Sequence, residues 1–437
     1  MNENPNPLPQ TSRRQFLKTS SAAALGGIAA ANLSFPETSF AQNSDTIRVG
    51  LIGCGGRGTG AANQALNADK NLILTAVADV FPDKIKGSLD TLKKGLPDKV
   101  NVEPGSSFIG LDAYQKVIDS GVDLVILTTP PGFRPQHLKA AIAAGKHVFC
   151  EKPMATDAPG LRSVLASVEE AKKKKLALVA GFCWRYDYAR REMFKRIHDG
   201  AIGNIRAIYA TYYTGPVKPM PPANTRPAGV TDVEWQLRNW YNFVWLCGDG
   251  LVEQAVHSID KIAWAMKDVP PLKAVAVGGR QIPNNQGNIY DHFEINYEYA
   301  DGVRAFLGCR QQTGCYSETR DYLMGTKGLG NIGGRRTPVE ITGEKSWAYD
   351  GPNPDMYQVE HDELFASIRA GKPINNGDRM CSSTLMAIMG RMAAYTGQEV
   401  TWEQALNSEE RLVPEKLDWN MNLPIAPLAM PGRTRFV

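Results

Sequence analysis

The chain has 437 residues, which is too long for one average domain and suits two. Its content of 43% hydrophobic and 22% charged residues is ordinary for a soluble globular protein. A formal net charge of +4 is close to balance, so the composition argues against nucleic acid or an anionic membrane surface as a partner.

The seven cysteines are scattered along the chain, and no two of them have the C-x-x-C spacing. This pattern argues against a zinc site and against a disulfide framework. We therefore expect no bound metal. Cys309 and Cys315 are near enough in sequence to form a disulfide, but free buried thiols are the favoured interpretation.

Near the start of the chain, residues 12–18 carry a paired-arginine motif, Ser-Arg-Arg-Gln-Phe-Leu-Lys. A weakly apolar run, 20–31, follows it, and Ser39 and Ala41 are small residues placed for cleavage after Ala41. The pattern resembles a twin-arginine (Tat) signal peptide, and an ordinary secretory signal is the alternative. We expect residues 1–41 to be a signal recognised by the Tat machinery, which would make the protein periplasmic or otherwise exported. No second apolar stretch is long enough to span a membrane, so we expect no segment to anchor the mature chain in a membrane.

The next segment predicts a nucleotide-binding turn. Apolar residues from Ile47 to Ile52 are typical of a buried parallel strand. Gly53, Gly55 and Gly58 then form a G-x-G-x-x-G pattern that leads into a helix. The glycines let the backbone approach a pyrophosphate closely, and the helix N-terminus offers it free N–H groups. A glycine turn without a ligand is the alternative, but this strand-turn-helix context favours a dinucleotide.

A second apolar run ends at Asp79, 21 residues after Gly58. A carboxylate at this position can bind both ribose hydroxyls of the adenosine, and it would repel a 2′-phosphate. NAD is therefore favoured over NADP as the cofactor.

Short helices and apolar strands alternate from there to about residue 183, which predicts a doubly wound parallel sheet for a domain of residues 46–183. Ligands of such sheets bind beyond the carboxyl ends of the strands. The predicted cofactor-binding residues, at or near those ends, are Gly53, Cys54, Gly55, Gly56, Arg57, Gly58, Asp79, Thr129, Pro130, His137, Glu151 and Lys152.

Residues 184–437 have a different pattern and are expected to form a second domain. Alternating segments at 205–215 and 292–312, the latter with a hairpin signal at Asp301-Gly302, predict a large open sheet that is mostly antiparallel. Helices are expected at 357–370 and 381–395. The last fifteen residues hold three prolines, so we expect an extended tail over a surface, or an arm on a partner subunit.

A further predicted helix, within 248–268, carries Glu253 and His257 one turn apart. A carboxylate four residues before a histidine can fix the histidine's tautomer or raise its basicity. A histidine near neutrality suits the removal of a proton from a hydroxyl while hydride leaves the same carbon. The alternative is a surface histidine paired with Glu253.

Several of these segments resemble the glucose–fructose oxidoreductase, inositol dehydrogenase and MocA (Gfo/Idh/MocA) family. The most specific is "AGKHVFCEKP", and "VGLIGCGGRG", "GAIGNIRAI" and "VEQAVHSID" also match. The resemblance implies a Rossmann domain followed by an α/β domain with an open sheet. It also implies that Lys152 reaches the nicotinamide and the reacting hydroxyl, that His257 is the acid/base, and that the Lys152–Pro153 bond is cis. Glu253 stands where the family usually has aspartate.

Aromatic rings and guanidinium groups suit sugar rings and hydroxyls, so the second domain offers candidate substrate contacts. They are Arg185, Tyr186, Trp235, Arg238, Trp240 and Trp245.

Together these features predict an NAD(P)-dependent oxidoreductase that acts on a hydroxyl or keto carbon of a sugar, cyclitol or derivative. Because free NAD is scarce outside the cytosol, an exported enzyme of this kind is expected to carry tightly retained cofactor, loaded before export. One alternative is a glycoside hydrolase or lyase that works through a transient keto-sugar. Another is a sugar- and NAD-binding protein without catalysis. Since members of the resembling family are commonly oligomers, a homo-oligomer is also expected.

Overall fold

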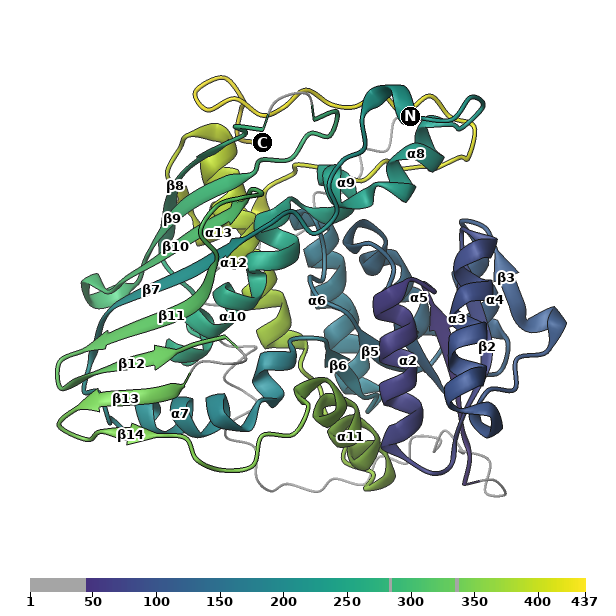
Figure 1. Ribbon diagram of the computed structural model, residues 1–437, viewed down its shortest axis with the longest axis horizontal. Helices are drawn as coiled ribbons and strands as arrows, with labels where there is room; N and C mark the ends of the chain where they lie inside the picture. Colours follow the sequence, from purple (N-terminus) through teal and green to yellow (C-terminus); the bar gives the residue numbers. More distant parts are fainter. Residues whose placement is uncertain (1–44, 283–284, 335–337) are drawn as a thin grey trace, which may run out of the picture.

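The computed structural model describes residues 45–282, 285–334 and 338–437. The predicted export signal, 1–41, lies outside the described residues. Two sheets dominate the fold, with helices between them (Figure 1).

The first sheet is parallel throughout and has the strand order β3-β2-β1-β4-β5-β6. Helices on both of its faces bury β4 and β5 completely, which is why these strands read as continuous apolar runs. The prediction of a doubly wound Rossmann sheet is confirmed. Its strands are β1 (Ile47–Ile52), β2 (Leu72–Asp79), β3 (Ser107–Ile109), β4 (Leu124–Leu127), β5 (His147–Cys150) and β6 (Leu178–Ala180). Its helices are α2 (Gly56–Ala68), α3 (Pro82–Gly95), α4 (Ala113–Asp119), α5 (Arg134–Ala143) and α6 (Ala158–Lys173).

The second sheet has the order β14-β13-β12-β11-β7-β10-β9-β8-β15 and is antiparallel except for the β7–β10 pair. The hairpin predicted at Asp301-Gly302 is confirmed, because both residues have positive φ and join β9 to β10. Its strands are β7 (Ile205–Thr214), β8 (Lys273–Gly279), β9 (His292–Glu298), β10 (Arg304–Gln311), β11 (Glu318–Gly325), β12 (Gly328–Ile332), β13 (Val339–Gly343), β14 (Trp347–Ala348) and β15 (Val400–Thr401).

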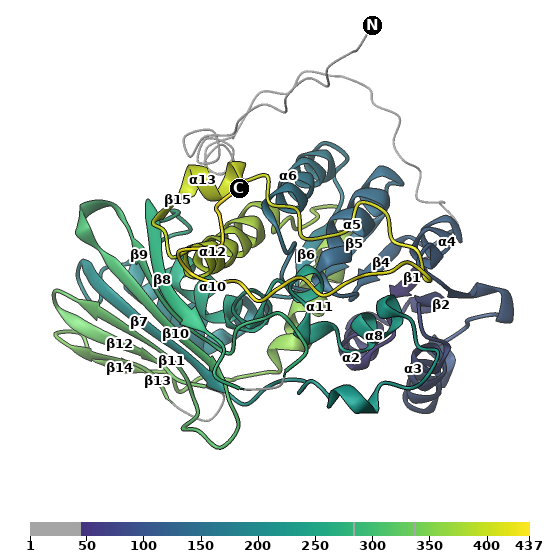
Figure 2. The same ribbon diagram turned by 90° about the horizontal axis from the view of Figure 1, so that it is seen from above.

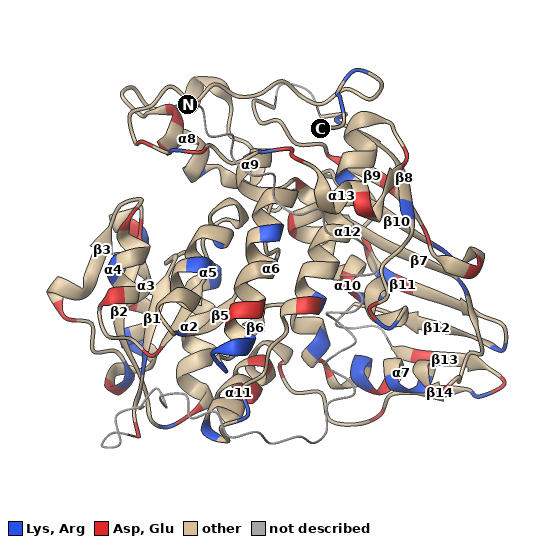
Figure 3. Ribbon diagram, turned by 180° about the vertical axis from the view of Figure 1, so that it is seen from behind, with Lys and Arg blue, Asp and Glu red and all other residues tan. Residues whose placement is uncertain are grey.

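Helices cover the inner face of this sheet and leave its outer face open (Figure 2). The helices of this half are α7 (Tyr188–His198), α8 (Asp232–Arg238), α9 (Val244–Cys247), α10 (Val256–Ala265), α11 (Met356–Arg369), α12 (Gly377–Thr396) and α13 (Trp402–Asn407). No helix among the described residues is long and apolar enough to cross a membrane. Basic and acidic residues are interspersed over both halves (Figure 3).

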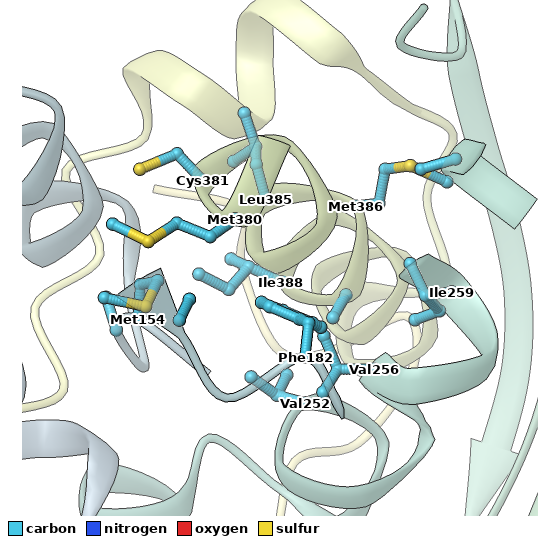
Figure 4. Close-up of a cluster of buried hydrophobic side chains, with 14 of the residues drawn as sticks. Met154, Phe182, Val252, Val256, Ile259, Met380, Cys381, Leu385, Met386 and Ile388 are labelled. Atoms are coloured by element: carbon cyan, nitrogen blue, oxygen red, sulfur yellow. The ribbon is translucent and has the colours of Figure 1, made fainter. Parts of the chain in front are cut away.

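Helix α12 is buried along nearly its whole length and connects the two halves of the molecule. Met380, Leu385 and Ile388 on this helix pack with Met154, which follows β5, and with Val256 of α10 (Figure 4). The loop after β5 and the start of α10 therefore share one apolar core with α12. The helix holds two segments that are a hundred residues apart in the sequence at fixed positions.

The second half of the chain also returns to the first domain. Helix α11 packs against α2. Leu178 of β6 pairs with the chain at Ile374 and Asn376, through hydrogen bonds of 2.8 Å each. Residues that follow the predicted domain boundary near residue 183 therefore also pack within the first domain.

The tail, residues 408–437, contains no helix or strand. It runs from α13 out over the Rossmann domain and back (Figure 2). All seven cysteines are free thiols, and Cys315 alone among them is exposed.

Arg185 and Tyr186, predicted as substrate contacts, lie instead within the protein core. The Arg185 guanidinium is 4% exposed and forms ion pairs with Asp260 at 2.8 Å and with Asp268 at 2.5 Å. The Tyr186 hydroxyl donates to Asn376 at 3.0 Å, and its ring is buried. Because these polar groups already have protein partners, both residues stabilise the junction between the domains.

The Arg185 network predicts a large loss of stability when its cation is removed. Arg185→Met leaves Asp260 buried without its counter-charge, which costs about 3–5 kcal/mol of unfolding free energy. Chemical denaturation measures the loss. Arg196→Met is the matched control, since Arg196 pairs with Glu192 at 3.8 Å with both side chains nearly half exposed, and little change is expected there. Equal losses of unfolding free energy in Arg185→Met and Arg196→Met would contradict the assignment of Arg185 to a buried ion-pair network.

Candidate functional site

The glycine turn after β1 has the shape that a dinucleotide requires. A Cβ on Gly58 would lie 1.9 Å from the carbonyl oxygen of Gly53, so only glycine fits there. Gly53 itself has a φ of +97°. In contrast, a Cβ on Gly55 or Gly56 would meet nothing within 4 Å. The turn is therefore tight on its inner side and open where a pyrophosphate would lie against the N-terminus of α2.

Asp79 lies at the carboxyl end of β2, beside this turn. Its carboxylate accepts hydrogen bonds from the backbone N–H of Cys54 at 2.7 Å and of Phe81 at 3.0 Å. Burial raises the pKa of the carboxyl group above its ordinary value, and these hydrogen bonds act in the opposite direction. Each carboxylate oxygen keeps a further lone pair for a ribose hydroxyl. Asp79 thus fits the predicted role toward the adenosine.

A pocket runs along the carboxyl ends of β1, β2 and β4 and contains several of the predicted residues, among them Gly53, Gly55, Asp79, Thr129, Pro130 and His137. The His137 ring stacks on Tyr114 at 4.1 Å, and its Nδ1 lies 3.2 Å from the Thr129 hydroxyl. Burial lowers the pKa of His137 to about 3, so the ring is neutral.

The second domain contributes one wall of this pocket, made by Lys218, Leu237, Arg238 and Trp240. Arg238 and Trp240, which were predicted to contact substrate, line this pocket together with Asp79 and His137. Trp235 and Trp245 are buried behind this wall, where the Trp245 indole donates to Gln236 at 2.7 Å.

Arg57 and Glu151, both predicted as cofactor residues, form an ion pair of 2.9 Å that links α2 to the end of β5. The Arg57 guanidinium also lies over the Tyr357 ring at 5.0 Å. The pair fixes the positions of the glycine turn and of the Glu151-Lys152-Pro153 segment relative to each other.

Lys152 follows Glu151 and precedes a cis peptide bond to Pro153, as the resemblance implied. Its Nζ donates to Oε1 of Glu253 at 2.9 Å and also to the backbone carbonyl of Glu253. Lys152 is 8% exposed and Glu253 is 4% exposed. A buried ammonium from one domain is thus held by a buried carboxylate from the other.

Glu253 belongs to a π-helical segment, Leu251–Ala255, that runs into α10. Such segments are frequent at functional sites because they redirect side chains. The second carboxylate oxygen of Glu253 accepts from the Gln254 amide. No hydrogen bond forms between Glu253 and His257, and the partners of the carboxylate are Lys152 and Gln254 instead.

His257 is the second residue of α10, and its ring is edge-on to Phe182 with 6.3 Å between centroids. Its Nδ1 is buried and has no hydrogen-bond partner within the part of the chain that the structure describes. Burial, and then the charges of Lys152 and Lys261, place the pKa of His257 well below 6.5. The imidazole is therefore neutral. Its Nε2, which forms no hydrogen bond with the described residues, is the ring nitrogen that a hydroxyl group can approach, because Nδ1 is buried.

The sequence patterns did not predict two groups of polar residues that lie at the site. Arg134 is 3% exposed and donates to the carbonyls of Pro153 and Thr129, which ties the loops after β5 and β4 together. The Gln254 side chain accepts from the Tyr212 hydroxyl at 3.0 Å and donates to Tyr241 at 3.4 Å. Arg134 is the first residue of α5, in the segment that follows β4, and this position could have indicated it in the sequence. No local pattern marks Tyr212 or Tyr241.

The described residues contain no group of three or more His, Cys, Asp or Glu side chains placed to hold a metal ion.

Two family models match the chain, and together they cover more than half of it. Residues 47–182 match the oxidoreductase family with an NAD-binding Rossmann fold. Residues 191–329 match the GFO/IDH/MocA C-terminal domain.

Several known proteins are similar to this chain in sequence or in fold. Inositol 2-dehydrogenase of Acidiphilium cryptum is 27% identical over 272 residues, which are 61% of this chain and 68% of that protein. A glycosyl hydrolase family 109 protein of Streptomyces coelicolor is 30% identical over 161 residues, 37% of this chain and 32% of that protein. The structure of levoglucosan dehydrogenase in complex with NADH and levoglucosan matches with a TM-score of 0.65 and 18% identity, over 82% of this chain and 99% of that one.

Proposed function

The chain belongs to the GFO/IDH/MocA family of NAD-binding oxidoreductases, and on this basis we propose that it oxidises or reduces one carbon of a sugar or cyclitol. The observation that carries the proposal is the Lys152–Glu253 ion pair next to His257, at the carboxyl ends of the Rossmann strands. When bound, NAD supplies the hydride acceptor for the oxidation of a secondary hydroxyl to a ketone.

Lys152 is placed to stabilise charge on the substrate oxygen. An ammonium has three hydrogens, and Glu253 takes two of them, through its carbonyl and its Oε1. The third can be donated to the reacting hydroxyl. As the proton leaves that hydroxyl, negative charge develops on the oxygen, and a fixed cation in a buried site stabilises it strongly.

His257 is the proton acceptor in this proposal. Its neutral ring can take the hydroxyl proton during oxidation and return it during reduction. Glu253 then acts by positioning Lys152, which differs from the direct partnership with His257 expected from their spacing.

A hydroxyl-bearing ring is the proposed substrate class because inositol 2-dehydrogenases are among the similar proteins. The similarity to the glycosyl hydrolase family 109 protein covers only 37% of this chain. We therefore favour net oxidation or reduction over glycoside cleavage. A purely binding protein would need neither the Lys152–Glu253 pair nor a neutral buried histidine.

We further propose that the protein is exported through the Tat pathway with its cofactor already bound. The paired arginines Arg13 and Arg14 support export of the folded chain. Retained NAD would have to be reoxidised in the same site, for example by reduction of a second sugar.

We also propose a homo-oligomer that forms through the open face of the nine-stranded sheet. Val275, Val277, Met324 and Leu329 are large apolar residues exposed on these strands. Covering them with a second copy removes this apolar surface from water.

The proposed role of Lys152 predicts that Lys152→Met lowers turnover by roughly 100-fold or more while NAD binding persists. NADH formation with myo-inositol and a panel of aldoses measures turnover, and NADH fluorescence measures binding. Lys146→Met is the matched control, because Lys146 lies in the same domain and donates only to the Val122 carbonyl, at 2.8 Å. Unchanged turnover in Lys152→Met would remove this residue from the mechanism.

The lowered pKa of His257 predicts the acid side of the pH profile. Because the neutral ring accepts the proton, kcat/KM for oxidation should stay level as pH falls through 6.5 and decline only below it. A steady-state pH series tests this, with His198→Ala as a control. His198 ends α7 and bonds to the Trp264 carbonyl of α10, so its replacement should leave the profile unchanged. A midpoint at or above the ordinary histidine value would refute the neutral-base assignment.

The export proposal predicts that replacing Arg13 and Arg14 together by lysine retains the protein in the cytoplasm. Cell fractionation measures this, and Lys18→Arg should leave export intact. Mass spectrometry of the denatured exported protein should then find NAD(H) in stoichiometric amount. Exported protein that is empty and exchanges added NAD freely would contradict the retained cofactor.

A further inference from the structure

The cofactor pocket is closed on its Asp79 side by a segment of the second domain. Leu237 and Arg238 at the end of α8, together with Trp240, line this pocket with Asp79 and Phe81. We call residues 217–247 the cap. A Rossmann domain alone would leave this side of the adenosine open to solvent.

The cap is fixed to the loop after β2 through Arg238. The Arg238 guanidinium lies over the Phe81 ring at 4.0 Å, and its Nη1 is 3.6 Å from Asp83. Leu237 is 4% exposed and belongs to the same buried cluster as Phe81. The residues that follow Asp79 are therefore packed directly under the cap.

The tail, residues 408–437, lies on the outer side of the cap and is bonded to it. The Gln236 amide donates to the carbonyl of Leu423 at 2.7 Å, and the Leu423 N–H donates to Asp232 at 3.2 Å. Trp419 meets Phe81 edge to face, with 6.0 Å between ring centroids. The tail thus contacts both the cap and the Rossmann loop.

Both ends of the tail also form bonds outside the cap. Near its start, Leu412 donates its N–H to Asp157 at 2.9 Å and Glu410 pairs with buried Arg391 at 2.7 Å. At its end, the Val437 carbonyl accepts from the Ser408 hydroxyl. The tail is a closed loop held at its base, with its middle pressed on the cap.

We propose that the cap binds the adenosine half of NAD through Leu237, Arg238 and Trp240, and that the tail sets how slowly the dinucleotide leaves. This inference rests on the proposed function in that it takes the ligand to be NAD. Release requires the cap to move away from Phe81. If the tail moves with the cap, the contact of Trp419 with Phe81 breaks, and if the tail stays in place, the hydrogen bonds of Leu423 to the cap break. The tail therefore acts on the release rate rather than on the reaction.

The test compares NADH release from the wild-type protein with release from Trp419→Ala. Each protein is loaded with NADH, freed of unbound ligand and mixed with excess NAD, and the loss of bound NADH fluorescence is followed. We expect Trp419→Ala to release NADH roughly tenfold faster or more, because the lost contact stabilises only the closed cap. Trp419→Phe keeps a ring edge against Phe81 and should stay near the wild-type rate.

Met430→Ala is the matched control, since Met430 lies on the same tail but is 50% exposed. Thermal unfolding of each variant verifies that the fold is intact. If Trp419→Ala fails to fold, Trp419→Leu replaces it, because leucine keeps an apolar side chain but loses the ring contact with Phe81, so faster release is expected there too. If the wild-type protein takes up no NADH, the proposed cofactor is wrong and this inference falls with it. If the wild type holds NADH and Trp419→Ala releases it at the wild-type rate, the role of the tail alone is overturned.

Discussion

The buried ion pair between Lys152 and Glu253 is the interaction on which the site depends. Each group is almost fully removed from water, and each is a charge that the interior cannot hold without a partner. Because the lysine comes from the Rossmann domain and the glutamate from the second domain, the pair is complete only when the domains are docked. The chemistry of the site and the packing of the two domains are therefore linked.

Buried Arg391 on α12 maintains that docking. Its guanidinium donates to the Thr156 carbonyl, just after the segment that carries Lys152, and to the Gly248 carbonyl, just before the segment that carries Glu253. The same side chain pairs with Glu410 at the start of the tail. One cation thus ties together the segments that carry Lys152 and Glu253 and the start of the tail.

The second domain has two separate roles toward the first. Its π-helix and α10 bring Glu253 and His257 to the proposed reaction centre, while its cap makes a wall of the adenosine pocket. The aromatic and arginine residues that resembled sugar contacts in the sequence divide between that wall and the protein core. Aromatic and arginine residues are suited to either location. Only the spatial neighbours of each residue show whether it belongs to the pocket wall or to the core.

The sequence by itself determined the Rossmann sheet, the glycine turn, Asp79 and the placement of Lys152 at a strand end. These features rest on periodicity and on steric demands between near neighbours, as the fit of Gly58 against Gly53 illustrates. The tertiary structure alone decided that Glu253 binds Lys152, that Arg185 is a core ion pair, and that the tail covers the cap. Those outcomes depend on partners 75 to more than 100 residues apart, whose approach is set by packing around α12 and not by any local pattern.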